Sequence, residues 1–209
     1  MNLKRSQPTR RALVLALGWT LTATWMSTPL ALRAAEDRVT VAGYTFERHL
    51  KLAGADLVLN GVGLRAVAWF KAFTAALYLS AKASNAADIA SLPGPMRLQL
   101  RPCRDLPAAE FVKALNVGLP RNSDPALLPA LAERQARLAG LISALDTLHE
   151  GDTIDLDFDP ARGLLFVVNG KLRGEPIPGQ DFYAALLRVF IGEHPSDQKL
   201  KAGLLGATA

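Results

Sequence analysis

The pattern Leu-Asn-Gly-Val-Gly-Leu-Arg occupies residues 59–65, and Phe-Lys-Ala-Phe-Thr-Ala-Ala-Leu-Tyr-Leu follows at residues 70–79. From Arg65 to Leu79 the chain is mainly apolar, which fits either a pair of strands or a helix. A buried guanidinium needs an anion or several hydrogen-bond acceptors, and the ten residues after Arg65 include no acid. The carboxylate or carbonyl of a ligand is therefore one candidate partner. The alternative is that Arg65 lies at the end of a strand and its guanidinium extends into water.

Strand and helix patterns are mixed over the rest of the chain. Strands are predicted at residues 39–51 and 56–59, with turns at Gly43 and Gly54, and at residues 96–100 and 164–168. Helices are predicted at residues 85–92, 107–119, 124–145 and 180–191. Asn169-Gly170 predicts a tight hairpin turn, and Ser196 is expected to cap a last short helix that ends near Leu205. Because antiparallel strand pairs are mixed with helical segments, the sequence predicts one α+β domain.

Residues 154–159 alternate apolar side chains with Asp155, Asp157 and Asp159, which predicts a half-buried strand. The aspartates also have the spacing of a calcium-binding loop, but the glycine and the glutamate that such a loop requires are missing. We therefore expect these aspartates to form the solvent-exposed face of the strand.

Other motifs for cofactors or metals are incomplete. Gly61, Gly63 and Ala66 fit a G-x-G-x-x-A pattern, but a dinucleotide site also needs an acid about 20 residues further on, and residues 80–87 contain none. The histidines are scattered without metal-ligand spacing, and Cys103 is the single cysteine, so no internal disulfide is possible. The sequence thus predicts no cofactor and no metal site, and its residues alone indicate no enzyme mechanism.

Residues 1–35 are predicted to be a cleavable signal peptide. Residues 12–26 are uncharged and mainly apolar, but a run of about 15 residues is too short for a membrane-spanning helix, which needs roughly 20. Small residues precede the first acid, Glu36, and four basic residues come before the apolar run: Lys4, Arg5, Arg10 and Arg11. We therefore expect an exported, periplasmic protein of residues 36–209 with no membrane span after cleavage. A retained membrane anchor is the alternative.

The basic excess of the chain belongs to this signal segment. The full chain has 24 Lys and Arg against 19 Asp and Glu, and five of the basic residues lie in residues 1–35. The remaining 19 basic residues balance the 19 acids, so the composition gives no indication of a nucleic-acid partner.

Several short sequence patterns follow one another along the chain. They are the pattern at residues 59–65, Ala75–Leu79, Asn169-Gly170-Lys171, Gly179–Gly192 with its Phe182, Leu200-Lys201 and Leu204–Gly206. Together they resemble the bacterial chalcone isomerase-like domain family over nearly the whole of the predicted mature chain. The resemblance implies an open-faced β-sandwich, in which helices pack on one face of a large antiparallel sheet and a cleft lies between them.

The resemblance also implies a site. The family includes isomerases that close a chalcone to a flavanone and relatives that bind fatty acids, and in both an arginine at the position of Arg65 reaches into the cleft. In the binders a tyrosine 13 residues later, here Tyr78, helps to hold a carboxylate. Thr74 loosely resembles a threonine of the isomerases. The isomerases carry a tyrosine at the start of the helix matching residues 107–119, where Phe111 is the only aromatic residue here.

We therefore expect the protein to bind a small apolar ligand with a carboxylate or carbonyl end. The polar end is expected to contact Arg65, Tyr78 and Thr74. Three aromatic residues either surround the tail of the ligand or belong to the core: Trp69, Phe70 and Phe73. Two alternatives are an isomerase or intramolecular lyase that acts on a chalcone-like enone, and a non-catalytic periplasmic protein that binds a partner.

Overall fold

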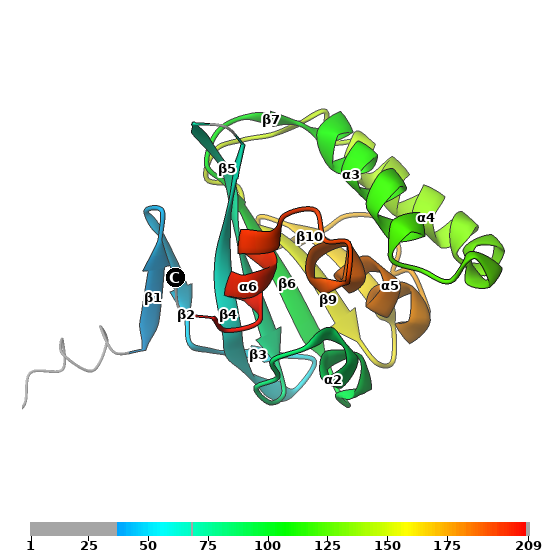
Figure 1. Ribbon diagram of the computed structural model, residues 1–209, viewed down its shortest axis with the longest axis horizontal. Coiled ribbons are helices and arrows are strands. Elements are labelled where there is room, and N and C mark those ends of the chain that lie inside the picture. Colours follow the sequence, from blue (N-terminus) through cyan, green and yellow to red (C-terminus); the bar gives the residue numbers. More distant parts are fainter. Residues whose placement is uncertain (1–36, 68, 208–209) are drawn as a thin grey trace, which may run out of the picture.

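The computed structural model describes residues 37–67 and 69–207, and the predicted signal peptide lies outside them. Its centre is a seven-stranded antiparallel sheet in the order β11-β10-β9-β6-β5-β4-β3 (Figure 1). The strands of this sheet are β3 (His49–Leu52), β4 (Ala55–Val67), β5 (Phe70–Leu79), β6 (Met96–Pro102), β9 (Ile154–Asp159), β10 (Gly163–Val168) and β11 (Lys171–Leu172).

Strands β4 and β5 form a hairpin. A pair of strands was one of the two structures predicted for the stretch from Arg65 to Leu79, and a helix was the other. Their register pairs Leu59 with Tyr78 and Arg65 with Phe73. β5 is buried from Ala72 to Leu79, since it lies inside the sheet and both of its faces are covered. A strand that is covered on both faces carries apolar residues at successive positions, which is why periodicity alone did not distinguish it from a helix.

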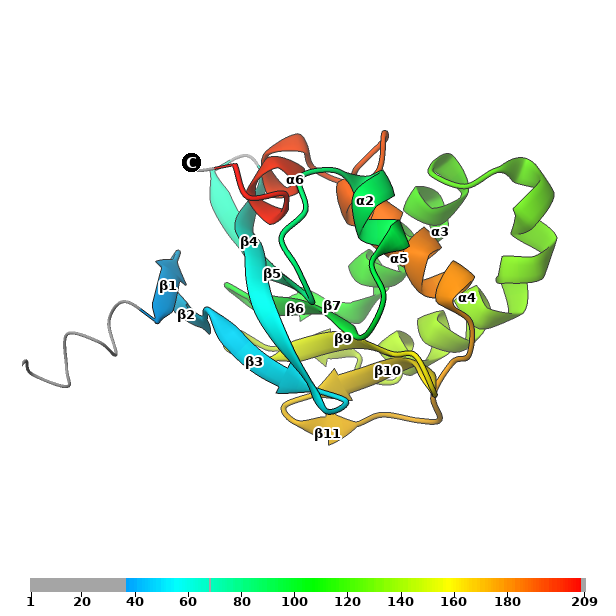
Figure 2. The same cartoon turned by 90° about the horizontal axis from the view of Figure 1, so that it is seen from below.

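Helices cover one face of this sheet (Figures 1 and 2). Apolar residues of α5 form one core with the helix-facing residues of the sheet. The helices are α2 (Ala86–Ser91), α3 (Ala108–Arg121), α4 (Leu128–Ser143), α5 (Gln180–Ile191) and α6 (Gln198–Leu204), and the 3-10 helix η1 (Pro125–Leu127) leads into α4. The predicted α+β architecture, a large antiparallel sheet with helices packed on one face, is confirmed.

The opposite face of the sheet is covered in part by a short hairpin. It consists of β1 (Arg38–Val41) and β2 (Tyr44–Glu47), and the Tyr44 hydroxyl donates to the carbonyl oxygen of Pro102 at 2.7 Å. Phe46 of this hairpin packs into a second apolar cluster with residues of β4 and β5: Leu57, Leu59, Ala76 and Tyr78. A third, two-stranded sheet joins β7 (Leu106–Pro107) to β8 (Thr147–Leu148).

Helix α6 lies directly against β4, because two glycines leave no side chain between the two backbones (Figure 1). A Cβ atom at Gly61 would overlap the carbonyl oxygen of Gly203, and a Cβ atom at Gly63 would lie 2.6 Å from the carbonyl oxygen of Leu200. The G-x-G pattern therefore serves close packing of backbone on backbone.

The cap of α6 differs from the prediction. Asp197 is the N-cap, and its carboxylate accepts the backbone N–H of Leu200 at 2.8 Å. The prediction that Ser196 caps this helix is wrong, because the helix begins at Gln198 and an N-cap side chain reaches only the first turn that follows it.

The aspartates of β9 are a second correction, because Asp155 and Asp157 are only 5% and 3% exposed. Strand β6 places Arg97 opposite Asp157 and Gln99 opposite Asp155. The Arg97 guanidinium donates to both carboxylate oxygens of Asp157 at 2.6 Å, and the Gln99 amide donates to Asp155 at 2.7 Å. Burial raises the pKa of Asp155, although the charge of Arg97 opposes this. The alternating pattern identified the strand but not the polar partners on its neighbour.

Candidate functional site

A cavity of about 570 Å³ lies between the sheet and the helices. Its walls come from β4, β5, β6, β9 and β10 on one side and from α3, α4 and α5 on the other, with the loop from α5 to α6 closing one part. Most lining side chains are apolar, among them Phe73, Leu100, Phe111, Leu156, Leu186 and Phe190. A mainly apolar cavity of this size with few polar groups is typical of a site for a small molecule.

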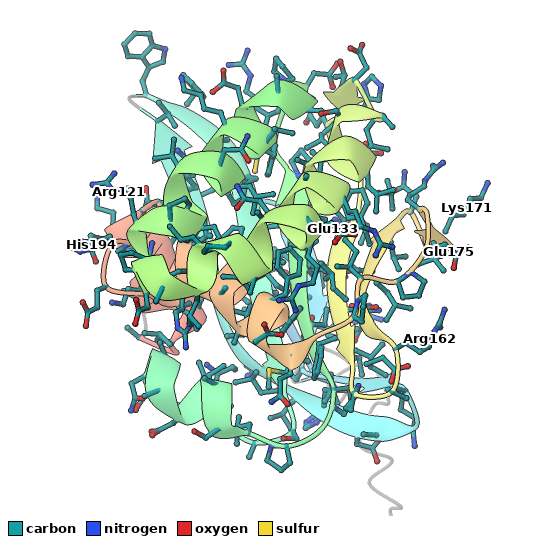
Figure 3. All side chains as sticks on the ribbon, turned by 90° about the vertical axis from the view of Figure 1, so that its right-hand side faces the viewer. Arg121, Glu133, Arg162, Lys171, Glu175 and His194 are labelled. Carbon is teal, nitrogen blue, oxygen red and sulfur yellow. The ribbon has the colours of Figure 1, made fainter. Side chains whose placement is uncertain are left out.

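The charged side chains that line this cavity are mostly basic. Arg65 comes from β4, and Lys113 and Arg121 come from α3, whereas Glu110 is the single acid among the lining residues that the structure describes. His194, from the loop after α5, also lines the cavity. Figure 3 shows Arg121 and His194 at the same edge of the molecule. Asn122 joins the two segments, because its amide donates to the His194 carbonyl at 2.8 Å and its oxygen accepts the His194 N–H at 2.9 Å. This balance of charge favours an anion.

Arg65 is half-buried near the end of β4, on the face that also carries Gly61 and Gly63. Its guanidinium carbon lies 5.8 Å from the ring centroid of Phe73, the residue opposite it in register. Such a cation–π contact holds the guanidinium at the cavity wall. Within residues 37–67 and 69–207, no carboxylate forms an ion pair with Arg65. Arg65 therefore lines the cavity, and its contact with a ligand stays a prediction.

The structure does not bring Tyr78 or Thr74 to Arg65. Successive residues of a strand point to opposite faces, and Tyr78 is five residues beyond Phe73 on β5. Tyr78 therefore packs with Phe46 on the face away from the cavity, and burial raises the pKa of its phenol. Thr74 points to the same face, where its hydroxyl donates to the carbonyl oxygen of Arg101 at 3.4 Å. Tyr78 follows Arg65 by the same number of residues as in the fatty-acid binders of the family, but this spacing does not place the two side chains in one site.

The three aromatic residues expected near the ligand tail do not all lie at the cavity. Phe70 and Phe73 line the cavity, but Trp69 lies at the turn between β4 and β5, is 93% exposed and takes no part in this lining. Phe111 on α3 faces the cavity, with its ring centroid 5.4 Å from that of Phe73. The helix on which the resemblance implies a tyrosine in the isomerases therefore carries a phenyl ring in the cavity wall.

The sequence analysis missed the basic residues of α3. Glu110, Lys113, Ala114, Val117 and Arg121 recur at intervals of one helical turn and all line the cavity. This periodicity was visible in the sequence as one face of the helix. No local pattern placed His194 or Ser196 at a cavity, because both lie in a loop that the folded chain brings to it.

Two further properties concern metals and membranes. The described part of the chain contains no group of three or more His, Cys, Asp or Glu residues that could hold a metal ion. Within the same residues, no helix is both long and apolar enough to cross a membrane.

An antiparallel sheet with helices on one face and a mainly apolar cavity between them defines an open-faced sandwich. The chain belongs to the chalcone isomerase-like family, whose model matches residues 38–206. Among solved structures it is similar to a fatty-acid binding protein from Arabidopsis thaliana, with a TM-score of 0.59 and 17% sequence identity over 80% of this chain and 95% of the plant chain. At this identity the likeness shows the fold. No curated protein sequence matches the chain significantly.

Proposed function

We propose that the protein binds a small, largely apolar ligand with a carboxylate or carbonyl end, such as a fatty acid, in the cavity between sheet and helices. The observation that carries this proposal is the guanidinium of Arg65, which lines an apolar cavity without a carboxylate partner among the described residues. A guanidinium can hold a carboxylate through two parallel charge-assisted hydrogen bonds. The fatty-acid binding of the plant neighbour supports the same ligand class.

Native mass spectrometry of the protein as purified tests this proposal directly. We expect a bound mass that is released when the protein is denatured, and saturable calorimetric binding when the stripped, refolded protein is titrated with a long-chain fatty acid. The methyl ester of the same acid is the matched control, because it keeps the tail and lacks the charge. Folded protein that binds neither the acid nor the ester would contradict the proposal.

We expect no enzymatic cyclisation of chalcones. The cavity carries Phe111 on α3, and a phenyl ring can neither give nor take a proton in the reaction. The loss of chalcone absorbance should therefore proceed at the same rate with and without the protein. Turnover above this background that disappears in Arg65→Met would favour the isomerase alternative.

We further propose that the protein is exported and that its first residues are removed. The support is the order of basic, apolar and small residues within residues 1–35. We expect the N-terminus of the mature protein to lie between residues 31 and 36, as determined by sequencing of the periplasmic form. Membrane-bound protein that still begins with Met1 would instead show a retained anchor.

A further inference from the structure

The end of the β4–β5 hairpin carries exposed apolar side chains. Trp69 is 93% exposed and Val67 is 42% exposed, although tryptophan is among the residues that are highly buried on average. Strand β5 pairs with β6 only as far as Phe73, so Trp69 and Phe70 lie beyond the last pair of these two strands. In Figure 1 this end of the hairpin lies at the edge of the molecule. It is therefore open to a partner.

The same hairpin end forms part of the cavity wall. Val67 and Phe70 face each other in register, and both line the cavity. Phe70 also borders a second, outer hollow that Trp69 and Lys71 line. The apolar lining of the cavity thus continues to the exposed end of the hairpin.

Two cations lie beside these apolar side chains. Lys71 is exposed next to Phe70 on β5, and the guanidinium carbon of Arg104 lies 4.9 Å from the ring centroid of Phe70. Within the part of the chain that the structure describes, no carboxylate forms an ion pair with Lys71 or Arg104. Basic residues beside exposed aromatic and aliphatic side chains are typical of surfaces that contact anionic lipid headgroups.

The acids of this region offset the two cations only in part. Asp105 and Glu150 line the same outer hollow as Lys71. The carboxylate of Asp105 already accepts the N–H of Glu150 at 2.9 Å and lies 3.4 Å from the Nδ1 of His149. The charge at this end therefore favours an anionic surface by a small margin, and the apolar side chains supply most of the expected binding.

A lipid bilayer fits a projecting hairpin end better than a protein surface does. A stable protein interface buries roughly 800 Å² on each partner, whereas one aromatic side chain buries about 150–250 Å². Trp69 and Val67 therefore offer too little area for a stable protein complex. A bilayer surrounds a projecting side chain, and the amphipathic ring of tryptophan favours the interface between membrane and water.

We propose that the end of the β4–β5 hairpin docks on anionic lipid bilayers and that the ligand passes there between the bilayer and the cavity. Trp69 enters the interfacial region, and Lys71 and Arg104 contact the headgroups. Val67 and Phe70 continue the apolar environment of the bilayer into the cavity wall. The uptake of the ligand at this end rests on the proposed function of the cavity, whereas the docking of the hairpin does not.

The fluorescence of Trp69 in the full chain tests the docking. Trp19→Phe together with Trp25→Phe leaves Trp69 as the only tryptophan, so the emission reports this position alone. We expect vesicles of phosphatidylcholine and phosphatidylglycerol to shift the emission to shorter wavelengths, and lipids brominated on their acyl chains to quench it. An emission spectrum that the vesicles leave unchanged would overturn the inference.

Co-sedimentation with the same vesicles compares the two edges of the sheet. Trp69→Ala should weaken binding by on the order of tenfold, the effect of one large apolar side chain, and Lys71→Gln by about fivefold. Leu172→Ala and Lys171→Gln are the matched controls, because β11 is exposed at the other edge of the sheet, and both should change binding less than twofold. Equal losses at the two edges would contradict a contact at the hairpin.

Titration with a fatty acid in the absence of vesicles separates this inference from the proposed function. Trp69 takes no part in the cavity lining, so Trp69→Ala should bind the acid in solution with wild-type affinity and take it up from vesicles several-fold more slowly. Uptake from vesicles at the wild-type rate would overturn the transfer of the ligand at this end. Wild-type protein that docks on vesicles but binds no fatty acid would overturn the proposed function and leave the docking in place.

Discussion

Arg65→Met should weaken the binding of a long-chain fatty acid by roughly tenfold to a few hundredfold. A hydrogen bond to a charged group contributes about 1.5–3 kcal/mol, and about 1.4 kcal/mol corresponds to a factor of ten in affinity. Methionine keeps an unbranched apolar stem against Phe73 and removes the charge, so the fold and the apolar wall should remain. Calorimetric titration of the variant and of wild type gives the ratio directly.

Two controls make this result specific. Arg162 is exposed in the turn between β9 and β10, is not part of the cavity lining, and lies at the opposite side of Figure 3 from Arg121. Arg162→Met removes the same charge and should leave the affinity unchanged. The methyl ester should lose less affinity than the acid in Arg65→Met. An equal loss in both arginine variants would mean that net charge, rather than a contact at Arg65, holds the ligand.

Asp157→Ala should lower the free energy of unfolding by about 3–5 kcal/mol, because it leaves the largely buried Arg97 guanidinium without its principal partner. Chemical denaturation monitored by circular dichroism measures this change. The variant that replaces both partners, Arg97→Met with Asp157→Leu, should recover only part of the loss. Apolar residues of similar volume often substitute for a buried ion pair without cost, but the buried Asp155, 3.7 Å from Arg97, then loses its cation.

The ion pair between Arg134 and Asp181 is the matched control. It has the same two-bond geometry, with both distances at 2.7 Å, but the Asp181 side chain is 62% exposed. Water screens such a pair, so Asp181→Ala should cost no more than about 1 kcal/mol. Equal losses in the two alanine variants would show that burial of Asp157 does not determine the cost.

Local patterns predicted several elements of the fold well, including a hairpin turn and the helix α5. The turn at Asn169-Gly170 has the positive φ values, 51° and 73°, that its sequence requires, and the helix predicted at residues 180–191 has those bounds. The pattern of β5 stayed ambiguous, because a strand covered on both faces has no polar alternation.

The site was predicted less completely, because it depends on which face of the sheet each side chain occupies. The position of Arg65 at the cavity follows from the family resemblance, but Tyr78 was assigned by its distance along the chain. The register of β4 and β5 sends Tyr78 to the other face. The spacing of two residues on different strands does not fix their faces unless the register and its irregularities are known, and this hairpin has two register shifts.

The packing of α6 on β4 has a consequence for how the protein is made. The side chain of Asn60 on β4 donates to the carbonyl oxygen of Leu204, 144 residues further along the chain, at 2.8 Å. A ribosome completes the strand that bears Arg65 long before it adds the helix that closes on it. Chains are synthesised from the N-terminus and domains generally fold as units. The cavity lining runs along the chain from Arg65 to Ser196, so the nascent polypeptide has no finished cavity until synthesis has passed α5 and the loop that follows it.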